Sequence, residues 1–376
     1  MIWEGWGVVY MEKKVYLCRL KFDLINMQVE GVDKLLALLN EYKELGIAKQ
    51  IDYDKFYLYS LITHSTAIEG STITEIENQL LFDEGITAKG RSLQEQMMNI
   101  DLKKAYEKAQ QWAKEHVDFS IEMLRELSGC VMKNTGAVYN TAQGVFDSSK
   151  GDLRLVGVTA GVGGRSYMNY QKVPMKLAEL CDALNQRRRD LLNTDDIIAK
   201  YMLSFDIHFR LVTIHPWVDG NGRMARLVMN MLQYEFGLIL SKIQKEDKVE
   251  YIQALIDSRE AETLEPIREF LLRVHIKNLA HEIAEYKKSQ EDDPINYVCD
   301  PIKVTYDPIK CVIDTKEKEV YDLVLEDNSL TYAEYATRLG VSDVTIKRRL
   351  SALKEKGIIR RQGSNKKGFW EIIKRI

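Results

Sequence analysis

The most constraining stretch of the sequence is HPWVDGNGRMAR, residues 215–226, which joins two segments with a strong helical pattern. Apolar residues recur at three- and four-residue steps over residues 195–214 and again over 223–236. That spacing places them on one face of an α-helix. Pro216 favours an end to the first helix, and a Gly-Asn-Gly run is unfavourable inside a helix. The sequence therefore predicts a helix, a tight turn and a second helix.

The residues of this turn suit the binding of a phosphate. Gly220 and Gly222 carry no Cβ, so the backbone amides on either side of Asn221 can turn towards a ligand. These amides lie at the start of the second helix, where free N–H groups and the helix dipole attract an anion. Arg223 and Arg226 are three residues apart, share a helix face and can fork onto phosphate oxygens.

Two further side chains add chemistry that a solvated turn would not need. Asp219 offers a hard oxygen ligand for Mg²⁺ beside the expected phosphate site. His215 carries a side chain whose usual pKa suits proton transfer. A solvated turn would account for the glycines, the asparagine and the aspartate, but not for a histidine and two arginines at these spacings. The pattern indicates a site for phosphate chemistry.

This stretch resembles the signature of Fic proteins, HPFxxGNGRxxR, with Trp217 in place of phenylalanine. A weaker likeness extends over residues from about 30 to 280. Fic proteins transfer the nucleoside monophosphate of a triphosphate, usually AMP from ATP, to a hydroxyl of a protein. The resemblance implies a mainly α-helical Fic-type core, in which His215 deprotonates a target Ser, Thr or Tyr and Asp219 holds Mg²⁺ between the phosphates.

The same resemblance assigns the nucleotide contacts. Gly220, Asn221 and Gly222 would steady the α-phosphate, and Arg223 and Arg226 would hold the β- and γ-phosphates. Relatives that transfer a phosphate carry Lys at the second glycine of the signature, so Gly222 favours transfer of AMP. ATP as substrate and Mg²⁺ follow from the resemblance, while UTP, GTP and CTP stay open as donors.

Residues 65–70, STAIEG, end a helical pattern near the N-terminus. Gly70 is typical of the residue after a helix, and the carboxylate of Glu69 at a helix C-terminus opposes the helix dipole unless a cation compensates it. The stretch matches the inhibitory motif of Fic proteins, S/T-x-x-x-E-G/N. The match implies that Glu69 pairs with Arg226 and that Ser65 braces the same site.

Residues 150–174, KGDLRLVGVTAGVGGRSYMNYQKVP, interrupt the helical patterns with β-branched residues and several glycines. They predict a β-hairpin, whose exposed edge could pair with the backbone of an extended peptide. The segment resembles the flap of Fic proteins, including GDLR where the family often has G-x-x-R. This resemblance implies that Arg154, Val156 and Val158 contact the target protein. A surface hairpin without a functional role is the alternative.

The C-terminal part predicts a second domain. TYAEYATRLGVSDVTIKRRLSALKEKG predicts two helices with a turn at Gly340, and IIRRQGSNKKGFWEII predicts two strands. This order resembles a winged helix-turn-helix domain that starts near Thr315. From residue 341 onwards, eleven Lys or Arg face three Asp or Glu, although the whole chain has a net charge of −3. Such a basic region suits contact with DNA phosphates through five side chains, those of Lys347, Arg348, Arg349, Lys366 and Lys367. A domain that binds protein is the alternative.

Bulk properties fit a globular chain of at least two domains, with 376 residues, 45% of them hydrophobic and 29% charged. The predicted division is an N-terminal helical region with the inhibitory helix at 1–115, a Fic core at 116–290, a linker at 291–312 and a winged helix-turn-helix domain at 313–376. Residues 1–25 alternate weakly and predict a short hairpin. The five cysteines show no CxxC spacing, and the sequence has no long apolar run and no basic start to a signal peptide. These features favour a cytoplasmic protein without membrane contact.

Together these features predict a protein adenylyltransferase that Glu69 inhibits. Two rivals stay open. A DNA-binding transcriptional regulator could use a Fic core only to sense nucleotide, although His215 would then have no task. A de-AMPylase would use the same residues, with Glu69 orienting a water. The sequence also leaves open which protein is the target, whether the chain modifies itself, and whether it forms a homodimer.

Overall fold

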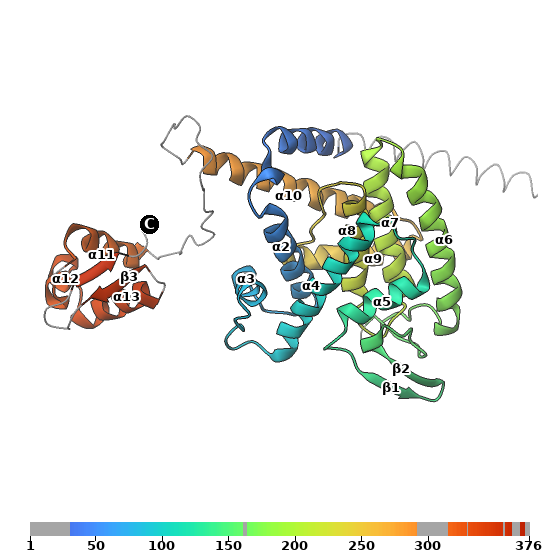
Figure 1. Cartoon of the computed structure of the whole chain (residues 1–376), viewed down its shortest axis with the longest axis horizontal. Helices are drawn as coiled ribbons and strands as arrows, with labels where there is room; N and C mark the ends of the chain where they lie inside the picture. The colour runs from blue at the N-terminus through green and yellow to red at the C-terminus, as the bar shows by residue number, and fades with distance from the viewer. Residues whose placement is uncertain are drawn as a thin grey trace, which may run out of the picture. The chain divides into compact units, whose positions relative to one another are not determined.

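The computed structural model describes residues 31–160, 164–291, 315–328, 330–355, 358–362 and 369–372. These residues fall into two compact units, one up to residue 291 and one from residue 315 (Figure 1). The hairpin expected at residues 1–25 and most of the expected linker lie outside the described residues. Within the described part of the chain, no helix is both long and apolar enough to cross a membrane.

The first unit is mainly α-helical, as the sequence predicts. Residues 31–44 form its first helix. The helices that follow are α2 (Tyr53–Ile68), α3 (Glu75–Asp83), α4 (Leu93–Lys114), α5 (Ile121–Val131), α6 (Val173–Leu192), α7 (Ile197–Ile214), α8 (Asn221–Glu235), α9 (Lys248–Glu260) and α10 (Glu265–Glu291). The helical patterns predicted at residues 195–214 and 223–236 agree with α7 and α8 to within two residues at each end, because periodic apolar faces drive burial.

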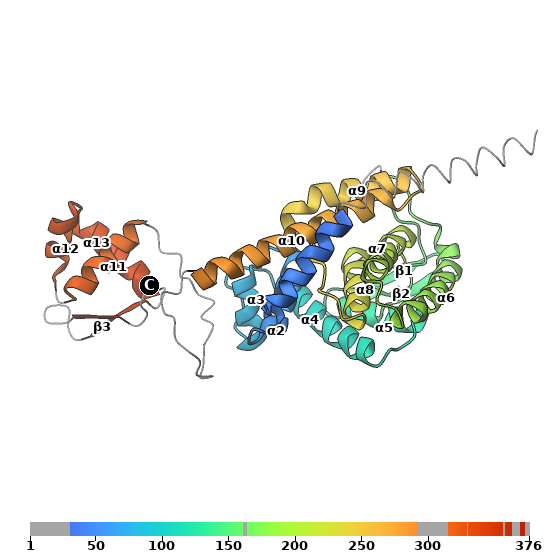
Figure 2. The ribbon, with the colours of Figure 1, turned by 90° about the horizontal axis from the view of Figure 1, so that it is seen from above.

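The core of this unit is built around α8, which packs along α7 and α4 (Figure 1). Twelve of the fifteen residues of α8 are buried, so this helix has no solvent-facing side and its polar residues must find partners inside the unit. Asn230, for example, accepts a hydrogen bond from Tyr106 of α4 at 2.7 Å. The helices α9 and α10 lie side by side (Figure 2).

A buried polar network fixes the end of α2 against its neighbours. Asn78 of α3 donates to Thr63 at 2.7 Å and to Asn99 of α4 at 2.9 Å, and Thr66 donates to the same Asn99 oxygen at 2.8 Å. Capping boxes begin both α3 and α4, which satisfies their first backbone N–H groups. Glu69, the C-cap residue of α2, is therefore held in a defined place.

The regular hairpin of the first unit lies upstream of the predicted one. Strands β1 (Val138–Thr141) and β2 (Gly144–Asp147) pair antiparallel. The hairpin predicted over residues 150–174 is short: its two arms meet in an antiparallel bridge between Thr159 and Ser166, with backbone hydrogen bonds from Tyr167 to Val158 at 3.0 Å and from Ala160 to Arg165 at 3.1 Å. The glycines weaken strand formation, and no neighbouring strand extends the pairing. Residues 161–163 lie outside the description.

The second unit confirms the predicted winged helix-turn-helix order. It contains α11 (Thr315–Glu326), α12 (Tyr332–Leu339), α13 (Asp343–Glu355), β3 (Ile359–Gln362) and β4 (Phe369–Ile372). The strands pair antiparallel. Gly340 ends α12 at a φ of 64°, a left-handed conformation that glycine adopts without strain. The unit has its own core, in which Val320, Tyr335, Ile346 and Trp370 are buried.

Candidate active site

The turn between α7 and α8 is closed by its own side chains. His215 ends α7 at a φ of 53°, and Gly220 precedes α8 at a φ of 77°. Asn221 accepts from the backbone N–H of Trp217 at 3.1 Å and donates to its carbonyl at 2.9 Å. The buried Trp217 ring donates to the carbonyl of Gly151 at 3.1 Å. The Asn221 side chain thus shapes the turn and leaves the backbone amides at the start of α8 to face an anion.

His215 lies under an aromatic ring from the segment after Arg154. The Tyr167 ring stacks on the imidazole with centroids 3.7 Å apart and planes 17° apart, and Arg259 of α9 lies 4.6 Å from the Tyr167 centroid. The pKa of His215 is lowered to about 4, mainly by burial and also by the Arg154 and Arg259 charges, against the opposite effects of a backbone hydrogen bond to Val212 and of the Asp219 charge. The imidazole is therefore neutral at neutral pH. With Nδ1 donating to the Val212 carbonyl at 3.3 Å, the lone pair of Nε2 is available to take a proton.

Arg154, which the sequence assigns to contact with a target protein, is buried in the structure and faces backbone carbonyls. Its side chain is 1% exposed, with Nε donating to the carbonyl of His215 and Nη1 to that of Val156, both at 2.7 Å. Nη2 donates to the carbonyl of Met168. A buried guanidinium needs several acceptors, and these backbone carbonyls supply them. Arg154 therefore ties the flap segment to the catalytic turn, while Val156 and Val158 are half-buried on that segment.

The expected pair between Glu69 and Arg226 is present. Arg226 Nη2 lies 2.7 Å from Glu69 Oε1. Its Nε donates to Ser65 Oγ and its Nη2 to the Ser65 carbonyl, both at 2.9 Å. Burial by itself would raise the pKa of Glu69, but the nearby Arg226 outweighs it, so the pKa falls below its usual value. Burial likewise opposes the charge of Arg226, yet Glu69 raises its pKa. Both shifts favour the charged pair.

Tyr251 holds Arg226 from the other side and is itself bonded to His208. The Tyr251 hydroxyl of α9 forms a hydrogen bond with Arg226 and lies 2.8 Å from Nε2 of His208 on α7. Both residues are buried, and burial lowers the pKa of His208 to about 3, with Arg226 adding to the effect. His208 thus has a supporting role in the core. The sequence gives no signal for Tyr251, which comes from a helix outside the signature.

The remaining signature residues fit a polyphosphate. Arg223 is buried, and its Nε and Nη1 have no hydrogen-bond partner among the described residues, an arrangement that an anion would satisfy. A Cβ on Gly222 would lie 2.4 Å from Glu69 Oε1, so the carboxylate of Glu69 sits directly over the glycine turn. Asp219 is 63% exposed, with one oxygen accepting from Gly220 N and the other 3.8 Å from Arg223.

A Mg²⁺ site made of protein ligands alone does not occur in the described part of the chain, which holds no group of three potential carboxylate, His or Cys ligands. The exposed carboxylate of Asp219 fits the other common arrangement, in which Mg²⁺ takes one carboxylate and completes its shell with phosphate oxygens and water.

Comparison with known proteins agrees with this geometry. The sequence pattern of the Fic/DOC family matches residues 118–233, which include the whole turn and most of α8. The pattern called winged helix-turn-helix DNA-binding matches residues 313–360. The chain carries a Fic domain. It is 26% identical over 240 residues to the protein adenylyltransferase fic-1 of Caenorhabditis briggsae, covering 61% of this chain and 43% of that protein.

Other relatives point the same way. The protein adenylyltransferase Fic of Drosophila melanogaster is 28% identical over 233 residues, covering 61% of this chain and 42% of that protein. The chain thus spans less than half the length of these curated relatives. A Fic domain containing signaling protein of Bacteroides thetaiotaomicron shares the fold with a TM-score of 0.56 at 23% identity, covering 68% of this chain and 98% of that chain. Fic-1 of C. elegans gives 0.56 at 20% identity, covering 74% and 78%.

Outside the Fic domain, the winged helix presents fewer basic side chains than the sequence predicts. Lys347 and Arg348 of α13 are exposed, and Lys347 lies 5.5 Å from the Tyr332 ring centroid. Arg349 is presented less openly, because its side chain is only 11% exposed and lies 3.3 Å from Glu319 of α11. Lys366 and Lys367 lie outside the described residues.

Proposed function

We propose that this Fic domain transfers AMP from ATP to a Ser, Thr or Tyr hydroxyl of a protein, and that Glu69 restrains the reaction. The observation that carries the proposal is the neutral, half-buried His215 beside a glycine turn with two basic side chains that suit an anion. Of the two arginines, Arg223 has unpartnered donors, while Arg226 is occupied by the carboxylate of Glu69.

In the proposed reaction, the target hydroxyl oxygen attacks the α-phosphorus of ATP. Nε2 of His215 takes the hydroxyl proton, a new oxygen–phosphorus bond forms, and the bond from the α-phosphorus to the bridging oxygen breaks to release pyrophosphate. Backbone amides at the start of α8 and the guanidinium of Arg223 would hold the phosphates in line. Bound beside Asp219, Mg²⁺ would offset the charge of the phosphates.

The restraint follows from competition for one guanidinium. Arg226 can place its Nη2 on Glu69 or on the γ-phosphate, and an anionic γ-phosphate next to the Glu69 carboxylate would suffer charge repulsion. The Glu69 oxygen also lies over Gly222, where the close approach of a phosphate to the backbone is expected. With Glu69 in place, ATP is expected to bind weakly or in an unreactive pose.

The decisive experiment incubates the protein and its Glu69→Gly variant with each nucleoside triphosphate and Mg²⁺. Mass spectrometry of the protein then measures the addition of one nucleoside monophosphate. His215→Ala in the Glu69→Gly background should slow transfer by about 10²–10⁴ while ATP binding persists, because the lost group acts on the hydroxyl. Unchanged transfer would refute the role of His215. Slower labelling in Glu69→Gly, with AMP removed from a pre-modified protein by the parent only, would favour the de-AMPylase.

A second candidate function, binding of duplex DNA, rests on the exposed basic side chains Lys347 and Arg348 of α13 in a domain of winged helix-turn-helix order. Affinity of the full chain for a DNA duplex should fall steeply with salt, because phosphate contacts release counterions. Reversing both charges should remove binding, whereas reversing the charge of the paired Arg349 should act through stability instead. A folded protein without a DNA shift at low salt would favour a protein partner for this domain.

A further inference from the structure

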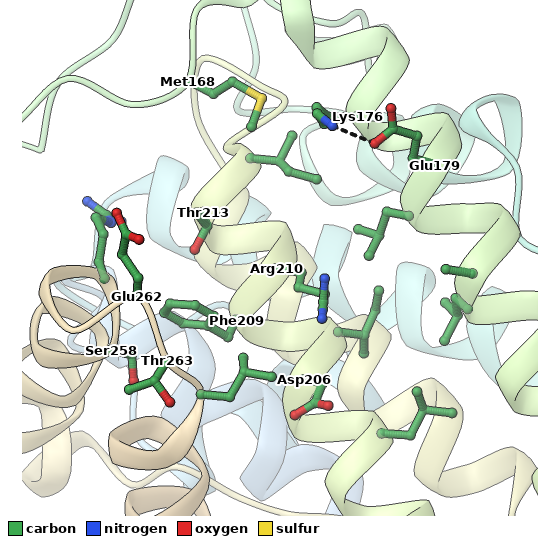
Figure 3. A pocket seen from close by; sticks show the side chains of 18 of the residues that line it. Met168, Lys176, Glu179, Asp206, Phe209, Arg210, Thr213, Ser258, Glu262 and Thr263 are labelled. Atoms are coloured by element: carbon green, nitrogen blue, oxygen red, sulfur yellow. Dashed lines mark hydrogen bonds and ion pairs between the residues drawn. The ribbon is translucent and has the colours of Figure 1, made fainter. Parts of the chain in front are cut away.

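A groove of the first unit lies between α6 and α7 and is bordered by the turn between α9 and α10 (Figure 3). Its volume is about 990 Å³. Leu180 and Leu184 of α6 and Leu203 and Phe209 of α7 give it an apolar floor. Pockets of this size and character commonly receive a ligand or an anchoring side chain.

The groove continues from the proposed active site. Thr213 and Ile214, the two residues before His215, line it, and so does Met168, the neighbour of the Tyr167 that stacks on His215. From Leu203 to Ile214 the groove follows α7 for about 16 Å, the length of four or five residues of extended chain. None of the signature residues 219–226 lines it, so the groove is separate from the expected phosphate site.

The charged side chains of the groove differ in whether they have partners. Lys176 lies 2.6 Å from Glu179, and Asp206 accepts a two-pronged pair from Arg268 at 2.6 Å. In contrast, Arg210 of α7 forms no ion pair with any residue in the described part of the chain.

Arg187, on the facing side of the groove, is likewise without an ion-pair partner among the described residues. The hydroxyl oxygen of Thr213 is buried and has no hydrogen-bond partner in the same residues. Glu262 and Glu265 also line the groove, at the turn between α9 and α10, and neither has an ion-pair partner among the described residues; one oxygen of Glu265 is buried there without a hydrogen-bond partner. The groove therefore offers an apolar floor, unpaired cations from α6 and α7, and unpaired carboxylates at the turn between α9 and α10.

From this arrangement we propose that the groove binds the segment of the target protein next to the modified hydroxyl. An aliphatic side chain of that segment would enter the apolar floor, and a carboxylate would face Arg210 and Arg187. This inference rests on the proposed function, since it names the sequence context of the same target.

The test uses the Glu69→Gly protein and synthetic peptides with a central Ser, Thr or Tyr, a leucine at varied spacing, and Glu or Lys at each flanking position. We expect Glu at one side of the hydroxyl to be favoured over Lys by about fivefold, the effect of a partly solvated ion pair. Arg210→Glu should reverse this preference. Lys89→Glu, an exposed cation outside the groove, should leave it unchanged.

A second pair of variants tests the groove by its volume. Ala183 lines the groove at an exposed position of α6, and Gln186, also exposed on α6, does not line it. Ala183→Trp should slow modification of the favoured peptides by at least about tenfold by filling a pocket for an anchoring side chain. Gln186→Trp should change nothing, and equal melting temperatures would show that both proteins are folded.

The outcomes separate the two proposals. Labelling of peptides without preference for Glu, or a preference that Arg210→Glu does not alter, would overturn the docking role and leave the proposed function standing. So would equal rates for Ala183→Trp and Gln186→Trp. Absence of any ATP-dependent labelling of peptides or of the protein itself by the Glu69→Gly protein would refute the proposed function and the docking role with it.

Discussion

Replacing Glu69 with glycine should lower the stability of the free protein and raise its activity. The change removes one partner of an ion pair whose Arg226 side chain is 4% exposed and whose Glu69 side chain is 34% exposed. Removing one partner of a fully buried pair typically costs about 3–5 kcal/mol. Because water reaches a third of Glu69 and part of the charge is already solvated, we expect about 2 kcal/mol here. For a unit of this size, that corresponds to a fall in melting temperature of about 4–8 °C.

Nucleotide should reverse this loss in the variant more than in the parent. Without Glu69, Arg226 is free for the γ-phosphate, so Mg²⁺-ATP at a hundred times its Kd returns about 2.7 kcal/mol. In the parent, ATP must first displace Glu69, which lowers the apparent affinity and the thermal shift. The labelling rate of the variant should exceed that of the parent by one or more orders of magnitude.

Thermal unfolding with and without Mg²⁺-ATP, together with mass spectrometry of the labelled protein, measures both effects. The matched control is Glu84→Gly. Glu84 ends α3 as Glu69 ends α2, each is followed by a glycine with a positive φ, and Glu84 forms no ion pair with any described residue. The control should change neither ATP response nor labelling. An active parent whose labelling is unaffected by Glu69→Gly would contradict the competition for Arg226.

Three further predictions follow from buried contacts. Arg154→Met should lower the labelling rate at least about tenfold, with little change in the ATP affinity measured by calorimetry. The reason is that Arg154 holds the carbonyl of His215 and the flap but no phosphate-binding residue. A change in ATP affinity alone would contradict this prediction. Tyr251→Phe should raise the KM for ATP more than it lowers kcat, because the hydroxyl orients Arg226; equal melting temperatures with an unchanged KM would refute it. His275 is buried with its pKa lowered to about 3 by burial, so the unfolded chain binds a proton below pH 6.5 that the folded chain excludes. Stability should therefore fall as the pH drops below 6.5, and His275→Phe should remove about 2 kcal/mol of that loss at pH 5 in denaturant titrations; an unchanged difference between pH 7 and pH 5 would contradict the assignment.

Much of the architecture follows from the sequence alone, because it depends on local rules. Apolar residues at helical spacing place the helices of both units, and the signature places a turn with an anion-binding helix start after His215. The pairing of Glu69 with Arg226 is also foreseen, although 157 residues separate them, because a short motif at each end identifies the partners. A glutamate at a helix C-terminus needs a cation, and that need is visible in the sequence.

Only the tertiary structure decides where side chains without a local constraint come to rest. From the sequence, Arg154 is expected to contact a target protein and Arg349 to contact DNA. Packing instead buries Arg154 against backbone carbonyls and pairs Arg349 with Glu319. Tyr167 reaches His215, and Tyr251 reaches Arg226, from segments that the signature does not include. The free energy of a buried charge or ring depends on every element packed around it, so these positions are fixed by the fold and not by their neighbours in sequence.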